Sequence, residues 1–294
     1  MKRGWITWDK SELPPPAFDA RLARVRQHLA AQDLPALVVY TDVWRSNQGR
    51  YLSNFMPYWN RALLVIPRDG APVLLCGLSP RVYSWIRSVT ILEDIRPNMN
   101  LAKMCAENGW TKVGVLDLPQ LPYDLSVPNA VDIPWSAIHP EPDEAELSMY
   151  RRAAKMAREI LSAEIPVGLD HEYVGRLEGK FRRAGAEDLV VLVTNGDTPP
   201  LPPRGLTLGA TSSVSVAMEY RGHWAKVVRS MTESSSRSRS KLELLSGPYP
   251  YESCQLDDLP PGAIIAAASE SFVDRKRIFS GDTYRLGPNG PELL

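Results

Sequence analysis

The residues best suited to acid–base chemistry lie in the segment 213–230, SVSVAMEYRGHWAKVVRS. His223 follows a glycine typical of a turn, and an imidazole titrates close to neutral pH, as a general acid or base should. Glu219, Lys226 and Arg229 lie within six residues of it. These four are the candidate catalytic residues. The other interpretation is a solvated turn histidine, because strand alternation can direct a side chain outward.

The overall composition excludes several classes of partner and location. Lys plus Arg and Asp plus Glu both total 34 in 294 residues, so no net positive field is available to hold nucleic acid or an anionic membrane surface. No apolar run reaches the roughly 20 residues that cross a bilayer. The N-terminal segment carries no apolar stretch behind its basic residues, and the three cysteines are scattered without a close pair. We therefore expect a cytoplasmic protein without disulfides.

The elements that must position these residues fall into two groups, which we predict as domains 1–140 and 141–294. In the first group helical and strand patterns alternate, which is typical of an α/β domain with a mixed or parallel sheet. The predicted helices are 18–32, 79–88 and 101–109, and the predicted strands are 35–42, 51–55, 61–67, 73–77, 89–94 and 112–117. The proline-rich segment 122–146 is interpreted as the connection to the second domain.

The second group begins with two helices and continues mainly as strands. Acidic residues crowd the first turn of the predicted helix 143–165, where they suit the helix dipole, and a second helix covers 171–185. Strands are predicted at 189–197, 213–220 and 223–230, with the last two joined by a turn at Arg221–Gly222. The Ser/Arg-rich stretch 233–241 is low in complexity, and its role is left open. Two further strands are expected in 259–272 and 282–294.

Several strings, taken in order, resemble the creatinase, prolidase and aminopeptidase P family. These strings are YLSNFMPYWNRALLVIP, DEAELSMYRRAAKMARE, GLTLGATSSVSVAMEYRGHWAKVVRS, LPPGAIIAAASESF and DTYRLGPNGPELL. The resemblance spans nearly the whole chain. It implies a creatinase-like α/β N-terminal domain followed by an α+β pita-bread-like domain. That second domain looks shortened and incomplete, because full-length relatives continue after the position of Ser230 with a second helical half.

The metal ligands that the resemblance implies are not matched in this sequence. Metal-dependent relatives hold two divalent ions with two Asp, one His and two Glu. The first Asp position is Ser215, the second falls on Lys226, and the two Glu positions fall near Ala268 and Gly281. An ammonium group cannot ligate a cation. We therefore expect neither a metal centre nor any other cofactor.

Creatinase hydrolyses a C–N bond without metal, but its residues are not matched here either. The position of its histidine is Thr198, and the position of the carboxylate beside the closing Arg229 is Val228. In the creatinase branch an aromatic residue and an arginine of the N-terminal domain reach the neighbouring subunit's active site. This resemblance implies substrate-binding roles for Trp59 and Arg61. The Arg61 guanidinium could bind a substrate carboxylate through two hydrogen bonds. The alternative is a tryptophan packed on its own domain beside a solvated arginine.

Three functional hypotheses follow from these features. The first is a degenerate, metal-free subunit that forms a homodimer, or a heterodimer with a related full-length subunit, and helps to bind a small carboxylated amide or amino-acid-type substrate. The second is a metal-independent C–N hydrolase with a rearranged site around His223. The third is a protein-interaction module built on an inactive peptidase fold.

Overall fold

The computed structural model describes residues 7–294 except 58–59, 126, 128, 233–238 and 247–251. The described residues divide into two compact units at Pro140–Glu141. No helix among them is long and apolar enough to cross a membrane. Trp59 and most of the Ser/Arg-rich stretch 233–241 lie outside the described residues.

The N-terminal unit is built on a mixed six-stranded sheet with the strand order β4-β3-β2-β1-β5-β6. Strands β1, β2 and β3 pair antiparallel, whereas β4, β5 and β6 join their neighbours in parallel. The central strand β1 is buried at every position, as expected for a sheet covered on both faces. The bounds are β1 Ala36–Thr41, β2 Ala62–Pro67, β3 Val73–Cys76, β4 Asp94–Pro97, β5 Val113–Leu116 and β6 Ala130–Ile133.

Helices cover both faces of this sheet, so two apolar clusters form. One cluster joins the sheet to helices α1, α2, α3 and α5 and includes Leu22, Leu52 and Ile86. The other joins the opposite face to α4 through Leu101 and Met104. The bounds are α1 Pro15–Ala31, α2 Asn47–Ser53, α3 Tyr83–Val89, α4 Leu101–Glu107 and α5 Trp135–Ile138, and short 3-10 turns lie at Pro80–Val82, Leu118–Gln120 and Tyr123–Leu125.

Three local predictions in this unit are wrong. Segment 51–55, predicted as a strand, belongs mostly to helix α2, which ends at Asn54 in a left-handed conformation with φ of 61°. The strand predicted at 89–94 begins only at Asp94. The supposed connector 122–146 contains strand β6 and helix α5. In each case a short apolar run carries no clear periodicity, so the tertiary contacts decide its conformation.

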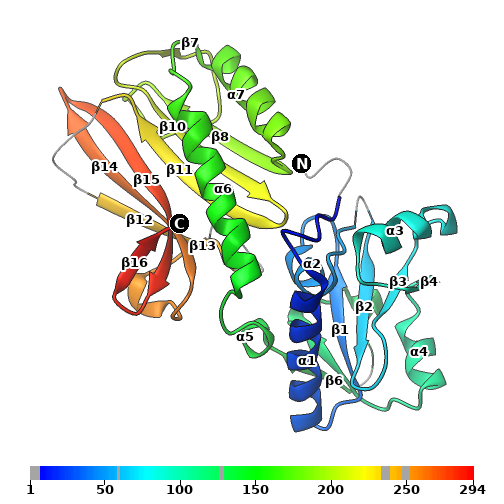
Figure 1. The fold of residues 1–294 in the computed structure, drawn as a ribbon. Coiled ribbons are helices and arrows are strands. Elements are labelled where there is room, and N and C mark those ends of the chain that lie inside the picture. Colours follow the sequence, from blue (N-terminus) through cyan, green and yellow to red (C-terminus); the bar gives the residue numbers. More distant parts are fainter. Residues whose placement is uncertain (1–6, 58–59, 126, 128, 233–238, 247–251) are drawn as a thin grey trace. The chain divides into compact units, whose positions relative to one another are not determined.

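The C-terminal unit places two helices against an antiparallel sheet (Figure 1). Helix α6 (Glu144–Ser162) begins at a capping box, in which the Asp143 carboxylate accepts the Glu146 N–H and the Glu146 side chain accepts the Asp143 N–H. Helix α7 (Asp170–Ala184) ends at Gly185, whose φ of 104° is the left-handed C-terminal conformation that favours glycine. Their buried faces meet β8, β10 and β11 in one apolar cluster.

The sheet of this unit has the order β13-β12-β14-β15-β11-β10-β8, and β16 pairs with β15. Its central hairpin joins β10 to β11 through the predicted turn at Arg221 and Gly222. Both of these residues have positive φ. No α-helix occurs among the described residues after α7. The bounds are β7 Gly168–Leu169, β8 Asp188–Thr194, β9 Thr207–Leu208, β10 Ser213–Tyr220, β11 His223–Ser230, β12 Arg239–Leu244, β13 Glu252–Ser253, β14 Ile264–Val273, β15 Lys276–Gly287 and β16 Gly290–Leu293.

Candidate functional site

The positions that the sequence resemblance matches to metal ligands lie together in the sheet of the C-terminal unit. Ser215 pairs with Val228, Val228 with Gly281, and Gly281 with Ala268, so three of the four matched positions and Val228 form one row across β10, β11, β15 and β14. Lys226 lies two residues before Val228 on the same strand. Val228 and Gly281, 53 positions apart in the sequence, are thus direct neighbours, as a shared site would require.

Lys226 is held in an ion pair at this row. Its Nζ lies 2.5 Å from Oε2 of Glu243, and Nζ of Lys241 lies 2.6 Å from the other oxygen of the same carboxylate. The side chains of Lys226 and Glu243 are 17% and 7% exposed, whereas that of Lys241 is 65% exposed. Burial alone would raise the pKa of Glu243, but hydrogen bonds from the two lysines outweigh it and lower that pKa. The Glu243 carboxylate is therefore ionised at neutral pH, and its negative charge is already balanced by the two lysines.

At Gly281, the backbone of the neighbouring strand leaves no room for a side chain. A Cβ added there would lie 2.5 Å from the Ala267 carbonyl oxygen and 2.7 Å from the Ala268 Cα. Both atoms belong to the backbone of β14, which pairs with β15 along ten residue positions and has little freedom to move. No side chain, and hence no ligating carboxylate, fits at position 281 without a shift of β14.

His223 lies against helix α6. Its Nδ1 is 2.9 Å from the Arg221 carbonyl oxygen, and its Nε2 is 3.9 Å from Glu146 Oε1. Its ring packs edge-on against Tyr150, with ring centroids 4.9 Å apart. Burial, with a smaller contribution from Glu146, raises the pKa of the Tyr150 hydroxyl well above its ordinary value. His223 therefore lies in a largely buried packing contact between the hairpin and α6.

The four candidate catalytic residues do not converge. Arg229 donates to the Ser162 hydroxyl at the C-terminal end of α6, whereas His223 contacts the N-terminal half of that helix. Alternation along β11 puts these two side chains on the helix-facing side and Lys226 on the other side. Glu219 pairs with Trp224, so its fully buried side chain shares the face of Lys226. The prediction that the four residues act together stays untested, but their side chains are not directed at one place where a substrate could be bound by all of them.

The donor set of this region does not fit a pair of divalent metal ions. Such ions need several carboxylate or imidazole ligands around them. Here an ammonium group and a glycine without room for a side chain lie at two of the four matched positions. The described part of the chain also contains no group of three or more His, Cys, Asp or Glu residues arranged to hold a metal.

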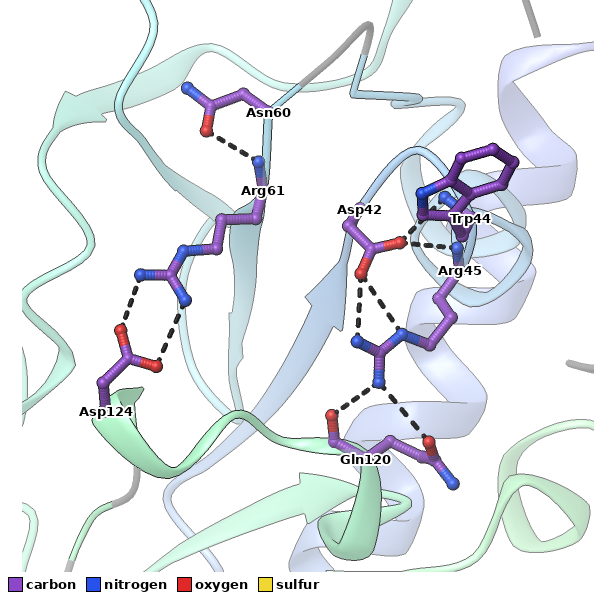
Figure 2. A network of polar contacts seen from close by, with 7 residues as sticks. All are labelled: Asp42, Trp44, Arg45, Asn60, Arg61, Gln120 and Asp124. Carbon is purple, nitrogen blue, oxygen red and sulfur yellow. Dashed lines mark hydrogen bonds and ion pairs between the residues drawn. The ribbon is translucent and has the colours of Figure 1, made fainter. Parts of the chain in front are cut away.

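The substrate-binding candidate Arg61 lies in the N-terminal unit, at the start of β2. Its two terminal nitrogens bind the two Asp124 oxygens, at 3.1 and 2.6 Å, in an exposed bidentate pair (Figure 2). The hydrogen bond from Arg61 lowers the pKa of Asp124. The guanidinium is therefore already occupied, and an incoming carboxylate would have to displace Asp124.

A second arginine of the same unit, Arg45, makes a separate set of contacts. Figure 2 shows Arg45 directed at Asp42 and Gln120, with its Nη2 3.1 Å from Asp42 Oδ2 and its Nη1 3.0 Å from the Gln120 carbonyl oxygen. The backbone N–H groups of Trp44 and Arg45 also donate to Asp42. Burial alone would raise the pKa of Asp42, but these hydrogen bonds outweigh it and lower that pKa. The Trp44 side chain is 74% exposed beside this network.

Sequence reasoning missed Glu243 and Asp124, the partners of Lys226 and Arg61. Lys241 and Glu243 alternate with Leu242 and Leu244 along β12, and that alternation is a strand signal, but the neighbouring Ser/Arg-rich stretch obscures it. Asp124 lies 63 residues from Arg61, and no local pattern links the two. The pair of Lys226 and Glu243 follows from strand order, and the pair of Arg61 and Asp124 from the packing of the 3-10 turn Tyr123–Leu125; the sequence alone contains neither.

Comparisons with known proteins bear on the fold. No family model matches the chain, and no curated protein matches its sequence significantly. Solved structures do match it. The chain is similar to an X-Pro aminopeptidase from Thermotoga maritima (TM-score 0.71, 13% identity, 92% of this chain and 96% of that one). It is also similar to a prolidase from Pyrococcus furiosus (0.68, 11%, 92% and 98%) and to an Xaa-Pro dipeptidase from Bacillus anthracis (0.66, 14%, 94% and 97%).

These similarities extend over nearly the full length of both partners, but the identities are low. They show that the chain has the two-domain fold of these peptidases, with an α/β N-terminal domain and a pita-bread-like C-terminal domain. The fold predicted from the sequence is thereby confirmed. Fold alone does not define chemistry, which depends on the residues of the site.

Proposed function

We propose that this chain is a non-catalytic relative of the Xaa-Pro peptidases, which holds no metal centre and acts as a binding subunit. It would do so as a homodimer or paired with a related full-length subunit. The observation that carries this proposal is the row Ser215–Val228–Gly281–Ala268 with the Lys226 ammonium beside it. The positions matched to metal ligands lie together in space, but they carry a serine, a lysine, an alanine and a glycine in place of carboxylates.

Two physical effects support the loss of metal binding. The Lys226 ammonium repels a divalent cation, and the nearby Glu243 carboxylate is already neutralised by two lysines. The backbone of β14 also fills the space that a carboxylate side chain at Gly281 would need. The second effect could be reversed only by a shift of the β14 backbone.

The position of His223 supports a binding role over metal-independent hydrolysis. A general base must come within hydrogen-bond reach of the proton that it removes. His223 instead packs against Tyr150 and lies 3.9 Å from Glu146. If the chain were a hydrolase centred on His223, turnover would persist in chelator and be abolished in His223→Ala.

The pairing remains part of this proposal on the strength of the sequence resemblance. Phe272 on β14 and Leu293 on β16 are 48% and 59% exposed, but they lie near opposite ends of the β14–β15 pair and form no common patch. A role for Trp59 and Arg61 in binding a small carboxylated substrate remains part of this proposal.

The test is hydrolysis of Xaa-Pro dipeptides by the purified chain with added Mn²⁺, beside an intact peptidase of the same fold as a positive control. We expect no turnover by this chain and no Mn²⁺ binding by calorimetry. Turnover that disappears in chelator would refute the proposal. Light scattering and purification from the native host test the pairing separately, and a stable monomer without an associated relative would contradict it.

A further inference from the structure

The C-terminal unit contains a hollow of about 290 Å³ at the surface of strands β12, β14 and β15. It lies at the end of the ligand row, because Val228, Gly281 and Ala268 line it together with polar side chains. In Figure 1 these strands extend beyond helix α6. The volume is near the lower end of the range for small-molecule pockets, so an occupant would be small.

The polar lining consists mainly of hydroxyl groups held by the strand register. Ser240 pairs with Ser269 and Ser269 with Ser280, so three serines form a row across three strands, and all three line the hollow. Ser269 Oγ lies 3.2 Å from Ser280 Oγ. Tyr284 lies four residues along β15 from Ser280 and therefore shares its face. Hydroxyls both donate and accept hydrogen bonds, so they suit a ligand that does the same.

One carboxyl group completes the lining. Asp282 Oδ1 accepts hydrogen bonds from Arg158 Nη1 at 2.8 Å and from the Thr283 N–H at 2.7 Å. Within the described part of the chain, no hydrogen bond reaches Asp282 Oδ2 or the Tyr284 hydroxyl. Burial, only partly opposed by the Thr283 N–H and Arg158, raises the pKa of Asp282. The hollow thus offers a carboxyl oxygen and a phenol to an incoming group.

Charge decides the class of ligand. The positive charge of Arg158 balances the negative charge of Asp282, so the lining has no net charge to attract an ion. An anion would meet the Asp282 carboxyl directly, and a cation would meet a carboxyl that is already paired. Ala267, two residues from Ser269 on β14 and so on its face, supplies a small apolar surface beside the hydroxyls, which suits the C–H face of a sugar-like molecule.

We propose that this hollow is a binding site for a small neutral polyol of monosaccharide size. The ligand would donate a hydrogen bond to Asp282 and exchange hydrogen bonds with Ser240, Ser280 and Tyr284, while its carbon skeleton lies on Ala267. This inference goes beyond the binding role proposed above, because the polyol would be a second ligand, distinct from the carboxylated substrate assigned to Trp59 and Arg61.

The test is saturation-transfer NMR on the full chain in chelator, with glucose as the neutral probe and ethanolamine and acetate as charged probes. We expect transfer to glucose that exceeds transfer to either charged probe. Ser240→Leu should fill the hollow and weaken glucose binding about tenfold, the loss of one well-placed contact. Ser253→Leu, at an exposed serine on β13, is the matched control and should leave binding unchanged.

No transfer to glucose, stronger transfer to a charged probe, or equal binding by Ser240→Leu would overturn the pocket assignment. Asp282→Asn provides a second variant if Ser240→Leu fails to fold, and it should also weaken glucose binding. Peptidase activity with Mn²⁺ would refute the non-catalytic role while leaving glucose binding in chelator measurable. The two proposals therefore fail independently.

Discussion

Replacement of Lys226 by Met tests whether the ammonium group is a structural substitute for cations at the ligand row. Removing one partner of a buried ion pair costs about 3–5 kcal/mol, because the remaining charge stays buried. Here Glu243 keeps its contact with the exposed Lys241, so we expect a smaller loss of about 2 kcal/mol at pH 7. Methionine preserves most of the side-chain volume, which limits any packing contribution.

The effect of Lys226→Met on the unfolding free energy should depend on pH, and the lowered pKa of Glu243 sets the direction of that dependence. The pKa of Glu243 is lowered in the folded chain, so its stabilising contribution is present above the ordinary pKa of about 4.3. It is lost as the pH falls through the lowered pKa. The difference in unfolding free energy between wild type and Lys226→Met should therefore shrink on acidification. Lys226→Met combined with Glu243→Gln should recover part of the loss at pH 7, because no charge then remains buried.

Trp224 provides the assay. It lies on β11 two residues from Lys226, and the other seven tryptophans all precede residue 141. Urea unfolding followed by ¹⁹F NMR of fluorotryptophan-labelled protein therefore resolves the C-terminal unit through one assignable signal. Lys155→Met, which removes an exposed pair with Glu159, is the matched control and should change stability by less than about 0.5 kcal/mol. A Lys226→Met effect as small as that of the control, or one independent of pH, would refute the reasoning.

Three further outcomes are expected. Gly281→Ala should destabilise the C-terminal unit by about 1–3 kcal/mol in thermal unfolding, since its Cβ meets the Ala267 carbonyl oxygen, and an unchanged melting temperature would contradict the steric closure. Asp143→Ala should cost about 1 kcal/mol by removing the capping box of α6, whereas Asp143→Ser should retain most of it. Ser215→Asp combined with Lys226→Asp should still bind no Mn²⁺ in calorimetry, because position 281 stays closed; measurable binding would show that two carboxylates are enough.

The sequence by itself determined the elements whose signals are local. Helical periodicity and an acidic first turn predicted α6, two strand patterns on either side of Arg221–Gly222 predicted the hairpin, and several strings in order predicted the fold. Short segments such as 51–55 were not determined, because their apolar runs fit a strand or a helix equally well and only packing separates the two.

Only the tertiary structure decided the chemistry of the site. The sequence supplied Lys226 and Gly281, but strand order brings Glu243 to the ammonium and the backbone of β14 to the glycine. Strand alternation likewise separates His223 from Lys226, although they are three residues apart. Ion pairs, steric closure and the face of a sheet are relations between distant segments, so they follow from the pairing of strands and not from any local pattern.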